Sequence, residues 1–314
     1  MSGVRAPLAA LAAAAAAAFV TGCPSSHGSP LPLPPPDQLP AATTSHAVVL
    51  VMENKEYGAV IGSRKAPYLN SLAKRYALPK RLYASRHPSL PNYLALIGGS
   101  TFGIDSDCTS CHVQARNLVD QLEQAGLSWK AYMQGMPKPC YKPGEHGRYA
   151  KKHNPFIYFD DIRTDPARCS RVVPDKALAP DLAHGRLPAF AWITPDLCND
   201  THDCGIATGD RFLKRLVPSL LHVLGPHGFL VLTYDEGDSD RGCCGGDAHG
   251  GRIAGVFAGP DVKRGARPGA AYDQYSILRT IEDAFGLDHL RRAASQRTLP
   301  LDAVFRRPPS GLGR

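Results

Sequence analysis

Carboxylate and carboxamide side chains directly follow two apolar runs of this sequence. They are Glu53 and Asn54 after residues 47–52, and Asp235 and Glu236 after residues 229–234. In an open α/β sheet, ligands bind outside the carboxyl ends of the strands, so these side chains can share one site. Carboxylate and amide oxygens are hard ligands that suit a divalent cation. The pattern predicts a metal site, although either motif alone could be a solvated acidic turn.

A serine lies between these two motifs, at the predicted start of a helix. Ser89 belongs to the segment HPSLPNY at residues 87–93, and an apolar run follows it. The commonest role of a serine at such a place is that of a helix N-cap. The same backbone N–H groups also favour a bound phosphate, and a metal-activated hydroxyl can attack phosphorus. Ser89 is therefore a candidate nucleophile as well as a candidate cap.

Three histidines lie near strand ends or glycine turns: His153, His202 and His249. Phosphoryl transfer needs hydrogen-bond donors around the phosphate and a general acid for the leaving group, and imidazole can supply both. A single histidine is more often a surface residue, which is our interpretation of His27, His112, His184, His222, His227 and His289. His153 and His202 are the best candidates.

The elements that must position these side chains alternate between strand and helix. Continuous apolar runs predict strands at 47–52, 129–133, 189–194, 229–234 and 252–258. Helical spacing follows Pro67 and recurs at 118–125 and 275–285, where Gly126 and Gly286 end the helices. This alternation predicts an α/β fold with a mainly parallel central sheet flanked by helices. Residues 135–188 fit neither period, so we expect a long insertion or lid there.

Composition indicates one globular catalytic domain, expected at residues 45–308 and monomeric. The chain has 314 residues, of which 43% are hydrophobic and 20% are charged, and one core can grow to about 250 to 300 residues. The net charge of +8 suits an anionic, phosphate-rich substrate. The basic residues are scattered and not interleaved with aromatic residues, so we expect no nucleic-acid partner.

The N-terminus is typical of an exported protein. Arg5 precedes an apolar run at residues 6–20 that ends in Thr21, Gly22 and Cys23. The run is shorter than the roughly 20 residues of a membrane-spanning helix. Residues 1–22 therefore read as a signal peptide, and the TGC sequence resembles a bacterial lipobox, which predicts membrane attachment through acylated Cys23. An ordinary secretion signal is the alternative, and the Pro-rich residues 23–44 read as a tether.

The other eight cysteines also favour export. They are Cys108, Cys111, Cys140, Cys169, Cys198, Cys204, Cys243 and Cys244. An even number suits four disulfides. A second CxxC that would complete a zinc site with Cys108 and Cys111 is absent from the sequence. Of the possible pairings we predict only the near neighbours Cys198 and Cys204.

Five segments, in this order, resemble the bacterial phosphoesterase family. They are MEN at 52–54, HPSLPNY at 87–93, KHNP at 152–155, WITP through NDTHD at 192–203, and DE at 235–236. The family includes secreted acid phosphatases, phosphoinositide phosphatases and phospholipases C, and the likeness spans about residues 45–288. The resemblance implies an alkaline-phosphatase-like fold.

The resemblance also implies roles for single residues. Ser89 would be the nucleophile that is transiently phosphorylated, and Glu53, Asn54, Asp235 and Glu236 would bind the metal. His87, His153 and His202 would surround the phosphate or protonate the leaving oxygen. Asn92, Asp203 and His249 are further possible site residues.

One position departs from the family pattern. Gln274 stands where many relatives carry a histidine, so either His249 substitutes for it or one phosphate or metal contact is weaker. A sulfatase is disfavoured because Tyr93 replaces the arginine of the C/S-x-P-x-R motif.

The sequence thus predicts an exported, metal-dependent acid phosphatase that hydrolyses small or phospholipid phosphate monoesters, including phosphoinositides. The alternatives are a phospholipase C type diesterase and a non-catalytic surface lipoprotein that binds an anion or a metal.

Overall fold

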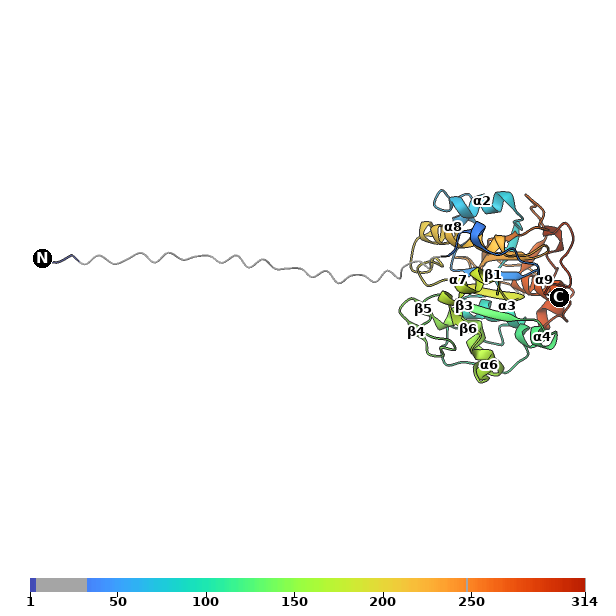
Figure 1. The fold of residues 1–314 in the computed structure, drawn as a ribbon, viewed down its shortest axis with the longest axis horizontal. Coiled ribbons are helices and arrows are strands. Elements are labelled where there is room, and N and C mark those ends of the chain that lie inside the picture. The colour runs from blue at the N-terminus through green and yellow to red at the C-terminus, as the bar shows by residue number, and fades with distance from the viewer. Residues whose placement is uncertain (4–32, 247, 314) are drawn as a thin grey trace. The chain divides into compact units, whose positions relative to one another are not determined.

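The structure is a computed structural model and describes residues 1–3, 33–246 and 248–313. The body contains a six-stranded sheet in the order β10-β8-β1-β7-β3-β6, of which β1, β3 and β6 are labelled in Figure 1. Its strands are β1 (Ala47–Met52), β3 (Trp129–Met133), β6 (Val172–Pro174), β7 (Phe190–Thr194), β8 (Phe229–Tyr234) and β10 (Gly255–Ala258). All neighbours in this sheet are parallel except β10, which runs antiparallel to β8. The predicted mainly parallel α/β architecture is confirmed.

Helices pack around this sheet in two groups. One group pairs α2 (Pro67–Arg75) with α8 (Ile206–His222), and the other joins α3 (Ser89–Gly98) to α4 (Leu118–Gln124) and α9 (Gln274–Phe285). Every residue of β1, β7 and β8 is buried, so the centre of the sheet is covered on both faces. This burial is the reason that these strands read as continuous apolar runs in the sequence.

Shorter elements complete the body. The remaining helices are α1 (Tyr57–Val60), α5 (Asp160–Arg163), α6 (Pro166–Cys169) and α7 (Leu178–Ala183), with 3₁₀ turns η1 (Pro36–Gln38), η2 (Lys151–His153), η3 (Pro155–Tyr158), η4 (Asp175–Ala177), η5 (Arg291–Ala294) and η6 (Asp302–Val304). A three-stranded sheet contains β11 (Ala271–Asp273), β2 (Arg81–Tyr83) and β9 (Arg252–Ile253), and β4 (Glu145–His146) pairs with β5 (Tyr149–Ala150).

The register of the central strands determines where the acidic residues that follow them lie. β1 pairs with β8 from Ala47 opposite Phe229 to Met52 opposite Tyr234. The two strands therefore end level with each other. Because the strands are parallel, the residues that follow them, Glu53 and Asp235, emerge side by side at the carboxyl edge of the sheet.

Two predictions about elements need correction. Residues 135–188 are not a lid, because β6 forms an edge of the main sheet and η2 carries His153. β6 has three residues and η2 is a single 3₁₀ turn, so both are too short to show the repeating pattern of apolar residues that identifies a strand or a helix in the sequence. The predicted strand at 252–258 is divided between β9 and β10, which belong to different sheets.

The N-terminal part of the chain is described only in part. The predicted signal peptide and Cys23 lie outside the described residues, apart from residues 1–3. Of the predicted tether, residues 33–44 are described, and they contact α8: Ser219 donates a hydrogen bond to the Pro34 carbonyl (3.1 Å), and the His222 ring lies 3.2 Å from the Leu39 carbonyl. Leu39 is buried, so this stretch is not a free spacer. Among the described residues, no helix is long and apolar enough to cross a membrane.

Four disulfides join the eight cysteines of the body. The pairs are Cys108–Cys111, Cys140–Cys169, Cys198–Cys204 and Cys243–Cys244. The predicted Cys198–Cys204 pair is confirmed. The Cys140–Cys169 bridge closes the region between β3 and β6 that the sequence left undefined.

Glu282 is a buried acid in the middle of α9, away from the carboxyl edge of the sheet. One of its carboxyl oxygens accepts a hydrogen bond from the Leu290 backbone N–H at 2.9 Å, and the other has no hydrogen-bond partner among the described residues. Burial raises the pKa of Glu282 to about 9, and the nearby charge of Asp283 acts in the same direction. The native protein therefore keeps a proton on Glu282 that the unfolded chain loses.

We predict that Glu282→Gln flattens the pH dependence of stability. A raised carboxyl pKa in the folded state means that stability is greatest at low pH and falls as the pH rises through the interval between the unfolded and folded pKa values. Between about pH 5 and about pH 9 this one group lowers the free energy of unfolding by up to about 1.4 kcal/mol per pH unit. Urea unfolding at several pH values should show a shallower fall for the glutamine variant, and an unchanged slope would contradict the assignment.

Candidate active site

Four acidic side chains converge where the central strands end. Glu53 follows β1, Asp200 follows β7, and Asp235 and Glu236 follow β8; all four are buried. Burial raises the pKa of Glu53 most, and the charges of Asp235 and Asp200 raise it further. Burial likewise raises the pKa of Asp200 and Asp235. The site therefore concentrates negative charge at a place where the protein provides little solvation for it.

Asn54 contacts this cluster through its backbone. Its N–H donates to Asp235 Oδ1 at 2.9 Å, and its φ angle of +54° lies in the left-handed region. Asparagine tolerates this conformation better than most residues. The turn after β1 thus holds the β8 carboxylate in place, and the predicted metal-binding role of the Asn54 amide oxygen stays a prediction.

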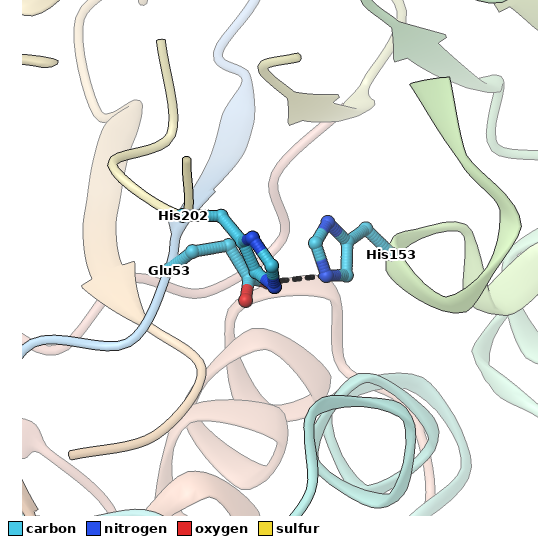
Figure 2. Close-up of side chains that lie close together, drawn as sticks. All are labelled: Glu53, His153 and His202. Atoms are coloured by element: carbon cyan, nitrogen blue, oxygen red, sulfur yellow. Dashed lines mark ion pairs between the residues drawn. The ribbon is translucent and has the colours of Figure 1, made fainter. Parts of the chain in front are cut away.

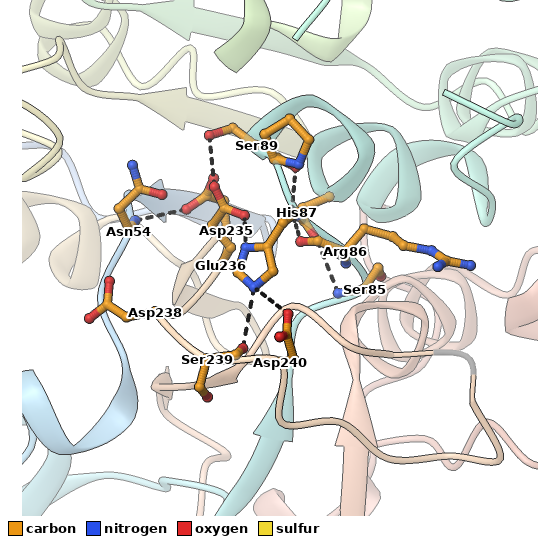
Figure 3. Close-up of polar contacts among 12 residues, drawn as sticks. Asn54, Ser85, Arg86, His87, Ser89, Asp235, Glu236, Asp238, Ser239 and Asp240 are labelled. Carbon is orange, nitrogen blue, oxygen red and sulfur yellow. Dashed lines mark hydrogen bonds and ion pairs between the residues drawn. The ribbon is translucent and has the colours of Figure 1, made fainter. Parts of the chain in front are cut away.

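Ser89 is the first residue of α3, and its hydroxyl does not cap the helix. The N-cap residue is Pro88. Ser89 Oγ lies 3.1 Å from Glu53 Oε2 and 3.3 Å from Glu236 Oε1 (Figure 3), within hydrogen-bond reach of both. The capping interpretation of Ser89 is therefore wrong. The hydroxyl instead lies between acids from two strands, at the positive end of a helix dipole that favours a bound anion.

His87 connects Glu236 to the loop that follows β8 (Figure 3). Its Nδ1 lies 2.5 Å from Glu236 Oε2, and its Nε2 lies 3.2 Å from the Ser239 carbonyl. Burial lowers the pKa of His87, but the Ser239 carbonyl and Glu236 outweigh that effect and raise it. Burial also raises the pKa of Glu236 to about 7. Because both ring nitrogens are engaged, His87 is placed to orient Glu236.

Two further histidines lie beside Glu53. One ligand atom from each of Glu53, His153 and His202 falls within 4.8 Å of the others (Figure 2). His153 is buried, stacks on the Tyr93 ring with centroids 5.3 Å apart, and has Nε2 3.2 Å from Glu53 Oε1. Burial lowers the pKa of His153 well below its usual value, which favours the neutral imidazole. A neutral imidazole is the form that can bind a metal.

His202 is more accessible than His153, with 27% of its side chain exposed. Its Nδ1 lies 2.7 Å from Asp203 Oδ1, and its backbone N–H donates to Asp200 Oδ1 at 2.7 Å. A carboxylate at Nδ1 fixes the orientation of the ring. The other ring nitrogen therefore faces the site.

The chemistry of these groups fits a divalent cation. Among the described residues, His153 Nε2, Asp200 Oδ2 and Asp235 Oδ2 are buried and have no hydrogen-bond partner, and such orphaned polar atoms are costly unless something binds them. A cation would also offset the repulsion between the acids. Carboxylate oxygens alone admit calcium, magnesium or manganese, whereas imidazole nitrogens among the ligands favour zinc or iron.

The sequence-based hypothesis missed Asp200 as a site residue. Asp200 belongs to the same NDTHD segment as His202, but it lies six residues beyond the end of β7 at Thr194, whereas Glu53 and Asp235 directly follow their strands, so its place after a strand gave no comparable signal. Tyr93 was missed as well, although it belongs to the HPSLPNY segment; its hydroxyl donates to Glu53 Oε1.

Asn92 and Gln274 hold backbone of the site and make no direct contact with the acidic side chains. Asn92 Oδ1 accepts hydrogen bonds from the N–H groups of Ser85 and Arg86, both at 2.9 Å, in the turn before Ser89. Gln274 accepts from the Ser85 N–H (2.9 Å) and donates to the Asp235 carbonyl (2.6 Å). Gln274 thus connects the turn before Ser89 to the end of β8.

His249 does not take the place of the histidine expected at position 274. Its side chain is exposed, and its Nε2 lies 2.8 Å from the Gly246 carbonyl. The glycine-rich turn around it directs the ring to its own loop, so the predicted substitution is wrong.

Residues 62–288 match the Phosphoesterase family. The chain belongs to this family. It is 33% identical over 250 residues to a phosphatidylinositol-3-phosphatase of Mycobacterium tuberculosis, covering 78% of each chain. It is 29% identical over 259 residues to a probable acid phosphatase of Kluyveromyces lactis, covering 78% of this chain and 59% of that one. This phosphoesterase is thus a hydrolase that acts on phosphoric ester bonds, and it spans little more than half the length of its yeast relative.

The fold is similar to that of several solved structures, among them a member of the alkaline phosphatase superfamily. The phosphonate monoester hydrolase of Silicibacter pomeroyi superposes with a TM-score of 0.55 at 12% identity, covering 85% of this chain and 78% of that one. A member of the alkaline phosphatase superfamily from Vibrio parahaemolyticus superposes with a TM-score of 0.52 at 13% identity, covering 84% and 72%.

We predict that a divalent cation stabilises the phosphoesterase and that Asp235→Asn removes this effect. Free metal at about 100 times its Kd should add about 2.7 kcal/mol to the free energy of unfolding of the chelator-treated protein. The metal-free Asp235→Asn protein should be more stable than the metal-free wild type, because one buried charge is gone. The gain in the free energy of unfolding on metal binding should be smaller in this variant than in the wild type.

Urea unfolding with zinc, manganese, magnesium or calcium measures both effects. Asp160→Asn is the matched control, because Asp160 pairs with His112 and Arg163 and belongs to no part of the cluster. If metal binding raises the free energy of unfolding of Asp235→Asn as much as that of the wild type, the metal binds elsewhere.

Proposed function

We propose that this phosphoesterase is an exported, metal-dependent phosphomonoesterase with Ser89 as its nucleophile. The observation that carries the proposal is the place of the Ser89 hydroxyl, at the start of α3 and within hydrogen-bond distance of two buried carboxylates that follow different strands. A serine with a carboxylate beside it and a helix N-terminus behind it suits attack on an anionic phosphorus centre.

In the proposed first step, Ser89 Oγ forms a bond to phosphorus as the ester P–O bond breaks. The hydroxyl proton passes to one of the two carboxylates that Ser89 contacts, Glu53 or Glu236, and His87 orients Glu236 for this role. A bound divalent cation, held by Glu53, Asn54, Asp235 and Glu236 with imidazole from His153, would lower the pKa of the attacking hydroxyl and offset charge on the phosphate oxygens.

His202 is the proposed donor of a proton to the leaving oxygen. It is the more exposed of the two histidines near Glu53, and Asp203 fixes its ring. Imidazole is suited to this role at neutral or mildly acidic pH. Water then attacks the phosphoserine, which releases inorganic phosphate and restores Ser89.

The substrate and the location of the enzyme are proposed on separate grounds. Similarity to a phosphatidylinositol-3-phosphatase and to acid phosphatases supports phosphate monoesters, phosphoinositides among them. The predicted signal peptide and four disulfides support export into an oxidising compartment, with a lipid on Cys23 as the proposed anchor.

Replacing Ser89 by alanine should lower kcat on p-nitrophenyl phosphate at least about a thousand-fold, because the group that attacks phosphorus is gone. The loss should be matched by chelation of the wild-type enzyme. Ser170→Ala is the control, since that exposed hydroxyl donates only to the Ala167 carbonyl in its own short helix. Full turnover by folded, metal-loaded Ser89→Ala would show that the nucleophile is another group.

Vesicles that contain phosphatidylinositol 3-phosphate distinguish two kinds of ester cleavage. We expect release of inorganic phosphate, with phosphatidylinositol left in the membrane. A phospholipase C type reaction would instead break the bond between glycerol and phosphate and release a soluble inositol bisphosphate. Detection of that product as the main one would replace the phosphatase assignment by a diesterase.

A further inference from the structure

Lys152 places an ammonium group at the edge of the acidic site. It lies in η2, directly before His153, and its Nζ is 2.9 Å from Asp107 Oδ2 and 3.3 Å from His202 Nε2. Its side chain is 20% exposed. Lys152 is therefore largely removed from solvent, yet it contacts the imidazole that faces the site.

Asp107 connects this ammonium to α3, the helix that begins at Ser89. Its Oδ2 pairs with Lys152, while its Oδ1 accepts a hydrogen bond from the backbone N–H of Leu90 at 2.9 Å. Leu90 is the residue after Ser89, so one carboxylate bridges Lys152 and the start of α3. The Cys108–Cys111 disulfide closes the turn that follows Asp107. Lys152 is thus linked through Asp107 to the backbone of the residue that follows Ser89.

The site contains more acidic groups than an anionic substrate would favour, and the Lys152 ammonium offsets part of this negative charge. Four buried acids surround the place where a phosphate must approach, and they repel an anionic substrate. A lysine ammonium is a compact charge on a flexible four-carbon stem, so a small movement can exchange one oxygen partner for another. Hydrogen bonds between charged partners are about twice as strong as neutral ones. A phosphate oxygen is a better partner for Lys152 than the imidazole nitrogen that it now contacts.

We propose that Lys152 binds a non-bridging oxygen of the substrate phosphate and makes the enzyme prefer monoesters to diesters. This inference rests on the proposed function and adds the residue that sets its substrate class. Above a second pKa near 6 a phosphate monoester carries about two negative charges, whereas a diester carries one. A fixed cation therefore stabilises the monoester more than the diester.

The test compares Lys152→Met with wild type on p-nitrophenyl phosphate and on bis-p-nitrophenyl phosphate at pH 7.5, where the monoester is a dianion. Methionine keeps most of the length of the side chain and removes the charge. We expect kcat/KM for the monoester to fall about 10- to 100-fold and that for the diester to fall several-fold less. Lys152→Arg should recover part of the preference for the monoester.

Lys130→Met is the matched control, because Lys130 forms a comparable ion pair with Asp181 (2.6 Å) away from the strand ends that carry the site. This control should leave the ratio of the two substrates unchanged. A second readout is the affinity of metal-loaded protein for inorganic phosphate, measured by calorimetry, which we expect Lys152→Met to weaken about 10-fold or more.

Equal losses on both esters, with unchanged phosphate affinity, would overturn the role of Lys152 and indicate a structural one. Failure of the wild-type enzyme to cleave either ester would instead refute the proposed function. In that case the phosphate affinity of Lys152→Met still decides whether Lys152 binds the anion.

Discussion

The parallel pairing of β1 with β8 is the constraint on which the rest of the site depends. Because Met52 and Tyr234 lie opposite each other at the ends of their strands, Glu53 and Asp235 emerge together into a space that the protein has already buried. Two carboxylates at such a place repel each other and lose solvation. The fold tolerates these two carboxylates because hydrophobic burial along all of β1 and β8 stabilises the sheet. Their uncompensated negative charge makes the site suited to a cation.

The remaining groups are positioned relative to this pair of strands. Gln274 and Asn92 fix the turn before α3, so that the Ser89 hydroxyl reaches the acids of both strands. The turn after β7 brings His202 to the same edge, and η2 brings His153. Gln274 stands where the resemblance led us to expect a histidine, and its amide holds two backbone segments together. Its presence is therefore compatible with an intact catalytic centre.

Features with local signals in the chain could be predicted from the sequence. Continuous apolar runs revealed β1, β3, β7 and β8, and polar residues at their ends revealed Glu53 and Asp235. Other features depend on tertiary contacts that have no local signal. β6 has three residues and is recognisable only by its pairing with β3. Asp200 joins the acids because β7 lies next to β1, and His249 fails to join them because a glycine-rich turn directs it to its own loop.

In the proposed reaction, Ser89 carries the phosphoryl group between the first and the second step. Metal-loaded enzyme can be quenched in acid during turnover of p-nitrophenyl phosphate, and the phosphorylated peptide can be mapped by mass spectrometry. We expect one phosphoryl group on the peptide that contains Ser89, located on that serine, and none on chelator-treated enzyme. A phosphoryl group on a histidine or another residue would contradict the role of Ser89, as would burst kinetics without any phosphorylated peptide.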